Sequence, residues 1–100
     1  MSLSVERELK NLIKTGKYTL GARSTIKAVA TGRAKMVIIA KNAPPELKDR
    51  VLYYARLGGI PVYTFEGTSQ DLGVVCGKPF KISMIAVIDE GSSRILELVS

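Results

Sequence analysis

The sequence predicts an α/β protein: a three-layer α/β/α sandwich in which one mixed four-stranded sheet carries helices on both faces. Helical periodicity and short apolar runs typical of strands alternate along all 100 residues. No linker, repeat or low-complexity tract interrupts them, which indicates a single domain over residues 1–100. Hydrophobic residues make up 46% of the chain, enough to form a core and too many for a disordered protein.

The predicted elements are four helices, four strands and a short closing segment. Their expected bounds are helices at 4–14, 23–31, 44–57 and 69–77, strands at 18–20, 35–41, 61–65 and 82–89, and a closing segment at 94–99. For the closing segment, a helix is favoured over a strand, and the strand alternative stays open.

Periodicity and capping residues define the first four elements. Leu9 and Leu12 lie on one face of the first helix, and Gly16 suits a left-handed residue just after it. Ser24 has a hydroxyl suited to the start of the second helix. The continuous apolar run at 35–41, "KMVIIAK", predicts a strand that is covered on both faces.

Prolines and glycines define the later elements. Pro44 or Pro45 is suited to the first turn of the third helix, which Gly58 and Gly59 end. Pro61 leads the third strand and favours an edge position, because proline cannot donate to a sheet ladder. Ser69 is the expected cap of the fourth helix.

The charge is unevenly distributed along the chain. The net charge is +6, but residues 1–50 hold eleven Lys or Arg and four acids, a net of +7, whereas residues 51–100 hold four and five, a net of −1. A one-sided positive field favours a polyanionic partner such as nucleic acid, although a merely solvated surface stays open. We also expect a soluble, intracellular protein, because no apolar run is long enough to span a bilayer.

Most catalytic chemistry is absent. The chain has no histidine and a single cysteine, Cys76, which precludes a zinc site beyond carboxylates. Neither a phosphate-loop motif nor G-x-G-x-x-G occurs. Cys76 lies between Val75 and Gly77, where a buried core thiol is favoured over a nucleophile. The sequence therefore predicts no enzyme, no metal and no cofactor.

The turn from the first strand into the second helix has groups suited to RNA. Gly21, Arg23 and Ser24 lie at a helix amino terminus, where free N–H groups and the helix dipole favour phosphate. Arg23 adds a planar donor fork, and Lys27 lies one turn later on the same face. A plain glycine turn with a serine cap and a solvated arginine is the alternative.

Two further loops fit the same purpose. Asn42 follows a strand and can read a base edge, or it can simply brace its turn. Phe80, Lys81 and Ile82 place apolar groups beside a cation, which suits an unstacked base, unless Phe80 is tucked into the core. The candidate base-contacting residues lie in loops, and no helix has the dense row of arginine or polar side chains typical of a helix that binds the major groove. Structured RNA is therefore favoured over duplex DNA.

Four segments resemble one known family in the same order: "LGARSTIKA", "AKMVIIAKNAP", "LYYARLGGIPVY" and "DLGVVCGKPF". The chain is similar over roughly residues 5–98 to the archaeal and eukaryotic large-subunit ribosomal protein family L-thirty-e, part of the kink-turn RNA-binding superfamily. The resemblance implies the three-layer sandwich and a structural role in the large subunit. It further implies binding of a kink-turn, a helical RNA segment bent sharply at an internal loop.

The resemblance also assigns roles. Gly21, Arg23, Ser24, Lys27, Asn42, Phe80, Lys81 and Ile82 match the family's RNA-contacting positions. It implies that Arg23 and Lys27 neutralise crowded phosphates, that Asn42 reads a purine edge, and that Phe80 and Ile82 cradle an extruded base. The implied partners are rRNA and neighbouring ribosomal proteins, with no membrane, and the implied state is a monomer when free, in the cytoplasm and on the ribosome.

Three alternatives stay open. Relatives in RNA-modification and ribonuclease P particles typically have asparagine and glutamate where this chain has Arg23 and Ser24, which favours the ribosomal branch. Some superfamily members are protein–protein regulatory modules, but those tend to be acidic. A small nucleotide-using enzyme is disfavoured by the absences described above.

Overall fold

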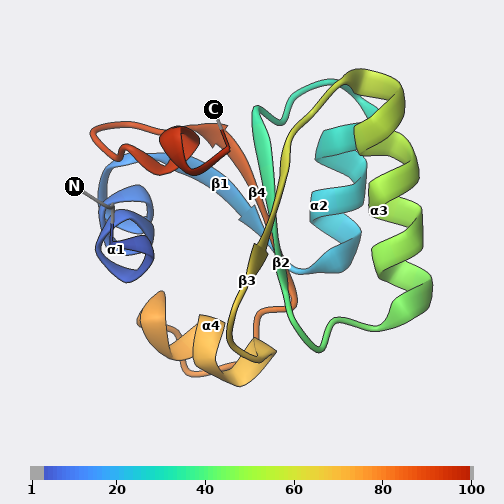
Figure 1. The fold of residues 1–100 in the computed structure, drawn as a ribbon. Helices are drawn as coiled ribbons and strands as arrows, with labels where there is room; N and C mark the ends of the chain where they lie inside the picture. The colour runs from blue at the N-terminus through green and yellow to red at the C-terminus, as the bar shows by residue number, and fades with distance from the viewer. Residues whose placement is uncertain (1–3, 100) are drawn as a thin grey trace.

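Residues 4–99 are described by a computed structural model of the chain, in which helices and strands alternate as the sequence predicts. The elements are α1 (Val5–Thr15), β1 (Lys17–Leu20), α2 (Ala22–Ala30), β2 (Met36–Ala40), α3 (Pro45–Gly58), β3 (Val62–Phe65), α4 (Ser69–Val75), β4 (Met84–Asp89) and the 3-10 helix η1 (Ile95–Leu98). The predicted α/β/α sandwich with a mixed four-stranded sheet is confirmed (Figure 1).

The strands form one sheet in the order β1-β4-β2-β3. β4 is antiparallel to both of its neighbours, and β2 is parallel to β3. Strands β1, β2 and β3 therefore end at the same edge of the sheet, where β4 begins. β3 is an edge strand, as the leading proline predicts.

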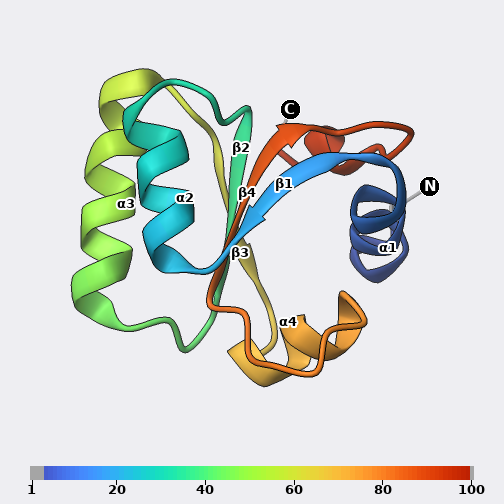
Figure 2. The same cartoon turned by 180° about the vertical axis from the view of Figure 1, so that it is seen from behind.

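Helices α2 and α3 cover one face of the sheet (Figure 2). Small side chains of α2 and α3, among them Ala28 and Ala55, pack on Val37, Ile39 and Ala86 of the central strands. Small residues let the helices approach the sheet closely. Every residue of β2 is buried, in keeping with the continuous apolar run.

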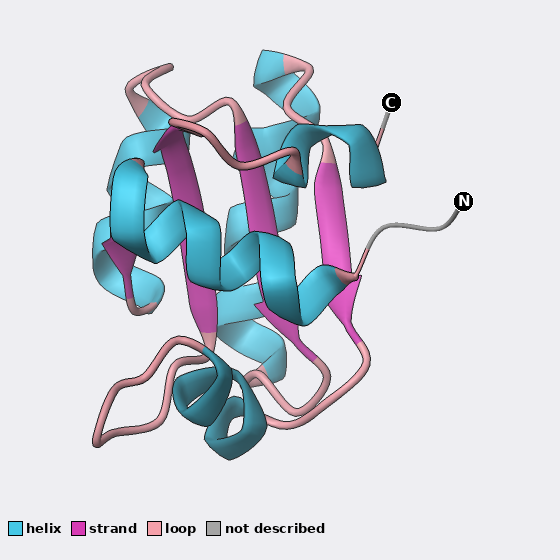
Figure 3. Ribbon diagram, turned by 90° about the vertical axis from the view of Figure 1, so that its left-hand side faces the viewer, coloured by secondary structure: helices cyan, strands magenta, loops and turns pink. Residues whose placement is uncertain are grey.

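Helices α1 and α4 and the helix η1 cover the other face (Figure 3). Leu9 and Leu12 of α1 pack with Ile38 and Ile85 of the sheet and with Leu72 of α4. The amino-terminal end of η1 and the preceding turn are tied to α1 through the buried carboxylate of Glu8. Glu8 Oε1 accepts a hydrogen bond from the Arg94 N–H at 2.7 Å.

Two capping predictions are wrong in detail. Thr68, not Ser69, caps α4, because its side chain accepts from the Asp71 N–H while the Asp71 carboxylate accepts from the Thr68 N–H. Gly16 is extended rather than left-handed, with φ −99° and ψ −179°. Glycine is needed there for room, since a Cβ would lie 2.5 Å from the Asp89 carbonyl oxygen.

Within residues 4–99, the structure contains no helix that is both long and apolar enough to cross a membrane.

Candidate nucleic-acid interface

The three loops singled out in the sequence meet at one end of the sheet, the lower end in Figure 1. The Gly21 N–H donates to the Met84 carbonyl at 2.9 Å, and the Ala40 N–H donates to the Ser83 carbonyl at 2.8 Å. Met84, the first residue of β4, and Ser83 just before it thus hold the ends of β1 and β2 on either side. We call this end the rim: the 21–27, 41–44 and 77–83 segments.

The start of α2 forms the first part of the rim. Gly21 occupies the N-cap position with φ 93° and ψ 160°, a backbone conformation that favours glycine. The first intrahelical bond runs from the Thr25 N–H to the Gly21 carbonyl at 3.1 Å, so the N–H groups of residues 22–24 precede the helical ladder. The prediction that Ser24 caps this helix is wrong, because α2 begins at Ala22 and no side chain caps it.

Arg23 and Lys27 are exposed on α2, as the sequence spacing predicts. The sequence did not indicate a third cation, which lies near Arg23. Arg50 of α3 lines a shallow hollow of about 380 Å³ together with Ala22, Arg23 and other residues. The two helices pack side by side, and this contact between residues 27 positions apart leaves no local signal in the sequence. Arg50 extends the positive strip from α2 to α3.

Asn42 lies in the turn after β2 and braces the rim. Its Oδ1 accepts a hydrogen bond from the Ser69 N–H at 2.7 Å, and the Ser69 carbonyl accepts from the Ile82 N–H at 3.0 Å. The peptide groups of Ser69 therefore connect the turn after β2 with the segment before β4. The bracing role that the sequence left open for Asn42 is real. Its side chain is also exposed, and the amide nitrogen makes no recorded bond to residues 4–99.

Phe80 and Ile82 have opposite environments. Phe80 is 54% exposed, so the alternative in which it is tucked into the core is excluded. Ile82 is 1% exposed and packs in the core with Leu72 and Ile85, so its side chain offers no surface to a base in this conformation. The expectation that Ile82 cradles a base beside Phe80 is corrected on that ground. Lys81, between them, is exposed.

Gly73 of α4 lies in close contact with the backbone of the loop that carries Phe80. A Cβ at Gly73 would overlap the Phe80 carbonyl oxygen, which belongs to the backbone and has no flexible side chain that could yield. The loop therefore lies directly against α4. The sequence did not indicate this contact. It limits how the backbone at Phe80 can be placed relative to α4, and so helps to position the exposed Phe80 ring.

Catalytic and metal chemistry is not evident in the described part of the chain. Burial raises the pKa of the Cys76 thiol to about 11, which keeps it protonated and unreactive at neutral pH. Among residues 4–99, no cluster of three or more His, Cys, Asp or Glu side chains is arranged to hold a metal ion.

Comparison with known proteins gives a consistent result. A model of the "Ribosomal protein L7Ae/L30e/S12e/Gadd45 family" matches residues 4–97. The large ribosomal subunit protein eL30 of Aeropyrum pernix is 53% identical over 95 residues, 95% of both chains. The eL30 proteins of Sulfurisphaera tokodaii and Methanothermobacter thermautotrophicus are 54% and 44% identical, over 92% and 97% of this chain and 87% and 99% of theirs.

Among solved structures, a protein of unknown function from Bacillus halodurans C is similar, with a TM-score of 0.83 and 28% sequence identity. The match covers 98% of this chain and 97% of that one.

Proposed function

Since the chain belongs to the ribosomal protein L7Ae/L30e/S12e/Gadd45 family, as a large-subunit ribosomal protein of the eL30 type rather than an enzyme, we propose that it acts by binding a kink-turn in rRNA. The proposal assigns the rim to a sharply bent helical RNA segment. The protein would stabilise the bend and, through it, the packing of the rRNA around it.

The observation that carries the proposal is the convergence of three loops on one rim. Ser69 links Asn42 to Ile82, and Met84 holds Gly21, so the rim is braced by hydrogen bonds before any RNA arrives. A preorganised surface loses little conformational freedom on binding. A kink-turn presents bent phosphates and unstacked bases together, and a rim with cations, an amide and an exposed ring suits both.

The electrostatic role falls to cations of the rim and to Arg50 of α3 beside it. Bringing phosphates together at a sharp bend is unfavourable, because like charges repel across a short distance. Arg23, Lys27 and Arg50 would offset this repulsion, with the N–H groups at the start of α2 directed at one phosphate. Glycine at position 21 would let the backbone approach the bent strand.

The recognition role falls to the other two loops. The amide nitrogen of Asn42 would donate to a purine edge of the internal loop while its oxygen stays with Ser69. Phe80 would stack on an extruded base with Lys81 beside its phosphate. Ile82 supports that loop from the core and is not assigned a contact of its own side chain.

Binding to a kink-turn RNA and to a straight duplex of equal length tests the proposal. We expect clear preference for the kink-turn and an affinity that falls steeply as salt rises, since several phosphates are neutralised. A Leu57→Ala variant is the matched control, because Leu57 is exposed near the end of α3 that lies away from the rim. Equal affinity for the two RNAs would remove the proposal.

Service in RNA-modification or ribonuclease P particles remains a second candidate within the same superfamily. Arg23 and Ser24 favour the ribosomal assignment, since the relatives in those particles typically have asparagine and glutamate there. Crosslinking in cell extract followed by RNA sequencing separates the two, because one predicts rRNA and the other small guide RNAs. We further propose that the free protein is a cytoplasmic monomer that contacts neighbouring ribosomal proteins once assembled.

A further inference from the structure

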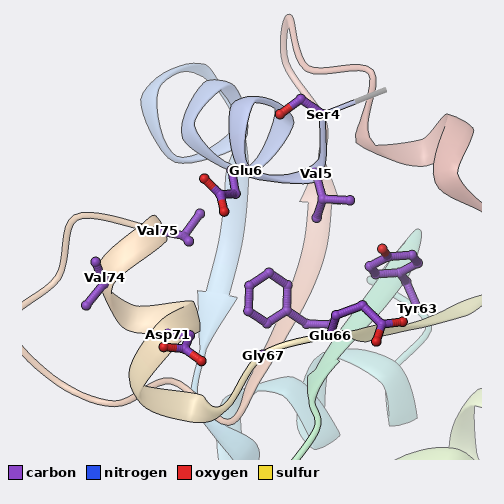
Figure 4. A pocket seen from close by; sticks show the side chains of 10 residues that line it. Ser4, Val5, Glu6, Tyr63, Glu66, Gly67, Asp71, Val74 and Val75 are labelled. Atoms are coloured by element: carbon purple, nitrogen blue, oxygen red, sulfur yellow. The ribbon is translucent and has the colours of Figure 1, made fainter. Parts of the chain in front are cut away.

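A groove lies on the sheet face opposite to α2 and α3, between α1, α4 and the edge strand β3 (Figure 4). Its volume is about 680 Å³. In Figure 4, Val5 and Glu6 come from α1, Asp71 and Val75 come from α4, and Tyr63 lies on β3. Nothing in the proposed RNA-binding function uses this groove.

The groove combines an apolar lining with acidic side chains. Its apolar residues are Val5, Tyr63, Phe65, Val74 and Val75. Val74 is 75% exposed. A partly apolar hollow framed by polar side chains can accept the apolar side chains of a partner.

All the charged residues that line the groove are acidic. Glu6, Glu66 and Asp71 line it, and no lysine or arginine does. Neither of the two ion pairs recorded among residues 4–99 involves these carboxylates, although Asp71 also accepts the Thr68 N–H within its capping box. In a chain with a net charge of +6, this local concentration of negative charge repels RNA and attracts a cation.

The edge strand adds a backbone feature. The Val37 N–H donates to the Pro61 carbonyl, and the Lys41 N–H donates to the Gly67 carbonyl, both at 3.0 Å. The odd-numbered residues of β3 therefore face β2, and the backbone groups of Val62 and Thr64 point away from the sheet. An extended segment can pair with such an edge and place alternate side chains over the groove.

We propose that this groove binds an extended, basic segment of a partner protein, with aliphatic side chains that alternate with lysine or arginine. The segment adds a strand to β3, its aliphatic side chains cover Val5 and Val74, and its cations meet Glu6 and Glu66. The proposal goes beyond RNA binding, because the rim and the groove use different residues.

A second copy of this chain is a less suitable occupant. It would have to offer a basic surface of its own, and contact between two unlike patches of the same chain leads to open-ended polymers rather than to a closed dimer. Polymers of this kind are easily detected by sedimentation, so the test includes this outcome.

A defined peptide tests the proposal. The probe is an amidated Lys-Val-Lys-Leu-Lys-Val-Lys peptide, and its control is the same peptide with every lysine replaced by glutamate. Chemical-shift mapping on the full chain should show saturable changes for residues 5–6, 62–67 and 71–75 with the basic peptide only.

Charge reversal supplies the matched variants. Glu6→Lys with Glu66→Lys should weaken peptide binding by about tenfold or more, because both attractions become repulsions. Glu46→Lys with Asp49→Lys changes the net charge equally on exposed positions of α3 and should leave peptide affinity within about twofold. All four positions are exposed, and the amide spectrum reports whether each variant is folded.

Three results would overturn the inference: no saturable shifts at the groove, equal affinity of the two double variants for the basic peptide, or self-association of the wild-type chain through the groove. Kink-turn affinity is measured on the same samples. Peptide binding without RNA binding would contradict the proposed function and support the groove. RNA binding without peptide binding would contradict the inference about the groove and support the proposed function.

Discussion

Asn42 Oδ1 lies 2.7 Å from the backbone nitrogen of Ser69, and this single hydrogen bond joins the turn after β2 to the start of α4. Because the Ser69 carbonyl also accepts the Ile82 N–H, the bond reaches on to the loop that carries Phe80. Asn42 is therefore both a brace of the rim and a candidate reader of RNA. The two roles use different atoms of the amide, so they are separable by substitution.

Asn42→Asp should separate the two roles. The carboxylate keeps an acceptor for Ser69 and loses the amide donors, so folding stability should stay within about 0.5 kcal/mol, while kink-turn binding weakens by roughly 1–3 kcal/mol. Asn42→Ala removes both functions and should also lower the free energy of unfolding by about 1–2 kcal/mol. Denaturant unfolding and RNA titration measure the two effects. If Asn42→Asp bound RNA with wild-type affinity, Asn42 would have only the structural role and would not contact the RNA through its amide nitrogen.

Phe80→Ala should weaken kink-turn binding by roughly 1–3 kcal/mol, because a stacking platform for one base is lost. Its effect on stability should be small, since the ring is largely exposed. Tyr53→Ala is the control, because Tyr53 is a 60% exposed aromatic residue on α3 and is not part of the rim. An equal loss of RNA affinity in both variants would contradict a specific role for Phe80.

Gly73→Ala should move the Phe80 loop, since the added Cβ overlaps the Phe80 carbonyl oxygen. We expect a stability loss of about 1–3 kcal/mol and a clear loss of kink-turn affinity. Val74→Ala, one residue later and exposed, meets no such obstacle and should keep its RNA affinity. Amide shifts confined to residues 77–82 in Gly73→Ala would locate the change. An unaltered loop and full affinity would show that the contact with α4 does not set the position of Phe80.

Glu8→Ala should destabilise the fold without changing RNA binding. Glu8 is buried, and its Oε1 accepts from the Arg94 N–H and, at 3.3 Å, from the Ser93 hydroxyl. Loss of the acceptor leaves the partly buried Arg94 N–H unpaired, whereas the Ser93 hydroxyl keeps its hydrogen bond to the Glu8 carbonyl at 2.7 Å, so the expected cost is about 1–3 kcal/mol in the free energy of unfolding. Glu8→Gln retains an acceptor oxygen and should cost less. Equal stability of the alanine variant and the wild type would contradict this role.

Cys76 should make folding stability depend on alkaline pH. Burial raises the pKa of its thiol from 9.0 to about 11, so between these values the folded chain keeps a proton that the unfolded chain has lost. Stability should therefore fall as pH rises through this range. Cys76→Ala lacks this titration, so its unfolding free energy should decline less steeply than that of the wild type from about pH 8 to 11. Identical slopes would mean that the thiol is not shielded from water.

The sequence predicts the architecture well because its signals are local. The stripe of Leu9 and Leu12 predicts α1, the buried run at 35–41 predicts a central strand, and Pro61 predicts the edge position of β3. The closing segment is a 3-10 helix, close to the helix that the sequence favours. Each of these features depends on residues within a few positions of one another.

The sequence predicts less where distant segments meet. Ile82 has the same local setting as Phe80, and only the packing against Leu72 and Ile85 shows that it is buried. The hydrogen bond between Glu8 and the Arg94 N–H spans 86 positions, so no local pattern in the sequence indicates it. The acidic groove forms only because α1 lies beside α4 and β3, and the periodicity of the sequence does not predict which elements are neighbours. The residues of the rim were predicted individually, but their bracing through Ser69 was not.

The most direct measurement of the central claim is energy transfer between dyes on the two arms of a kink-turn RNA, titrated with the protein in low salt without divalent cations. Phosphate repulsion keeps the free RNA extended under these conditions. If the rim binds and stabilises the bend, transfer efficiency should rise and saturate at one protein per RNA, and Arg23→Ala should shift the titration to higher protein concentration. Binding without a change in transfer efficiency, or a matching response from a straight duplex, would contradict the account.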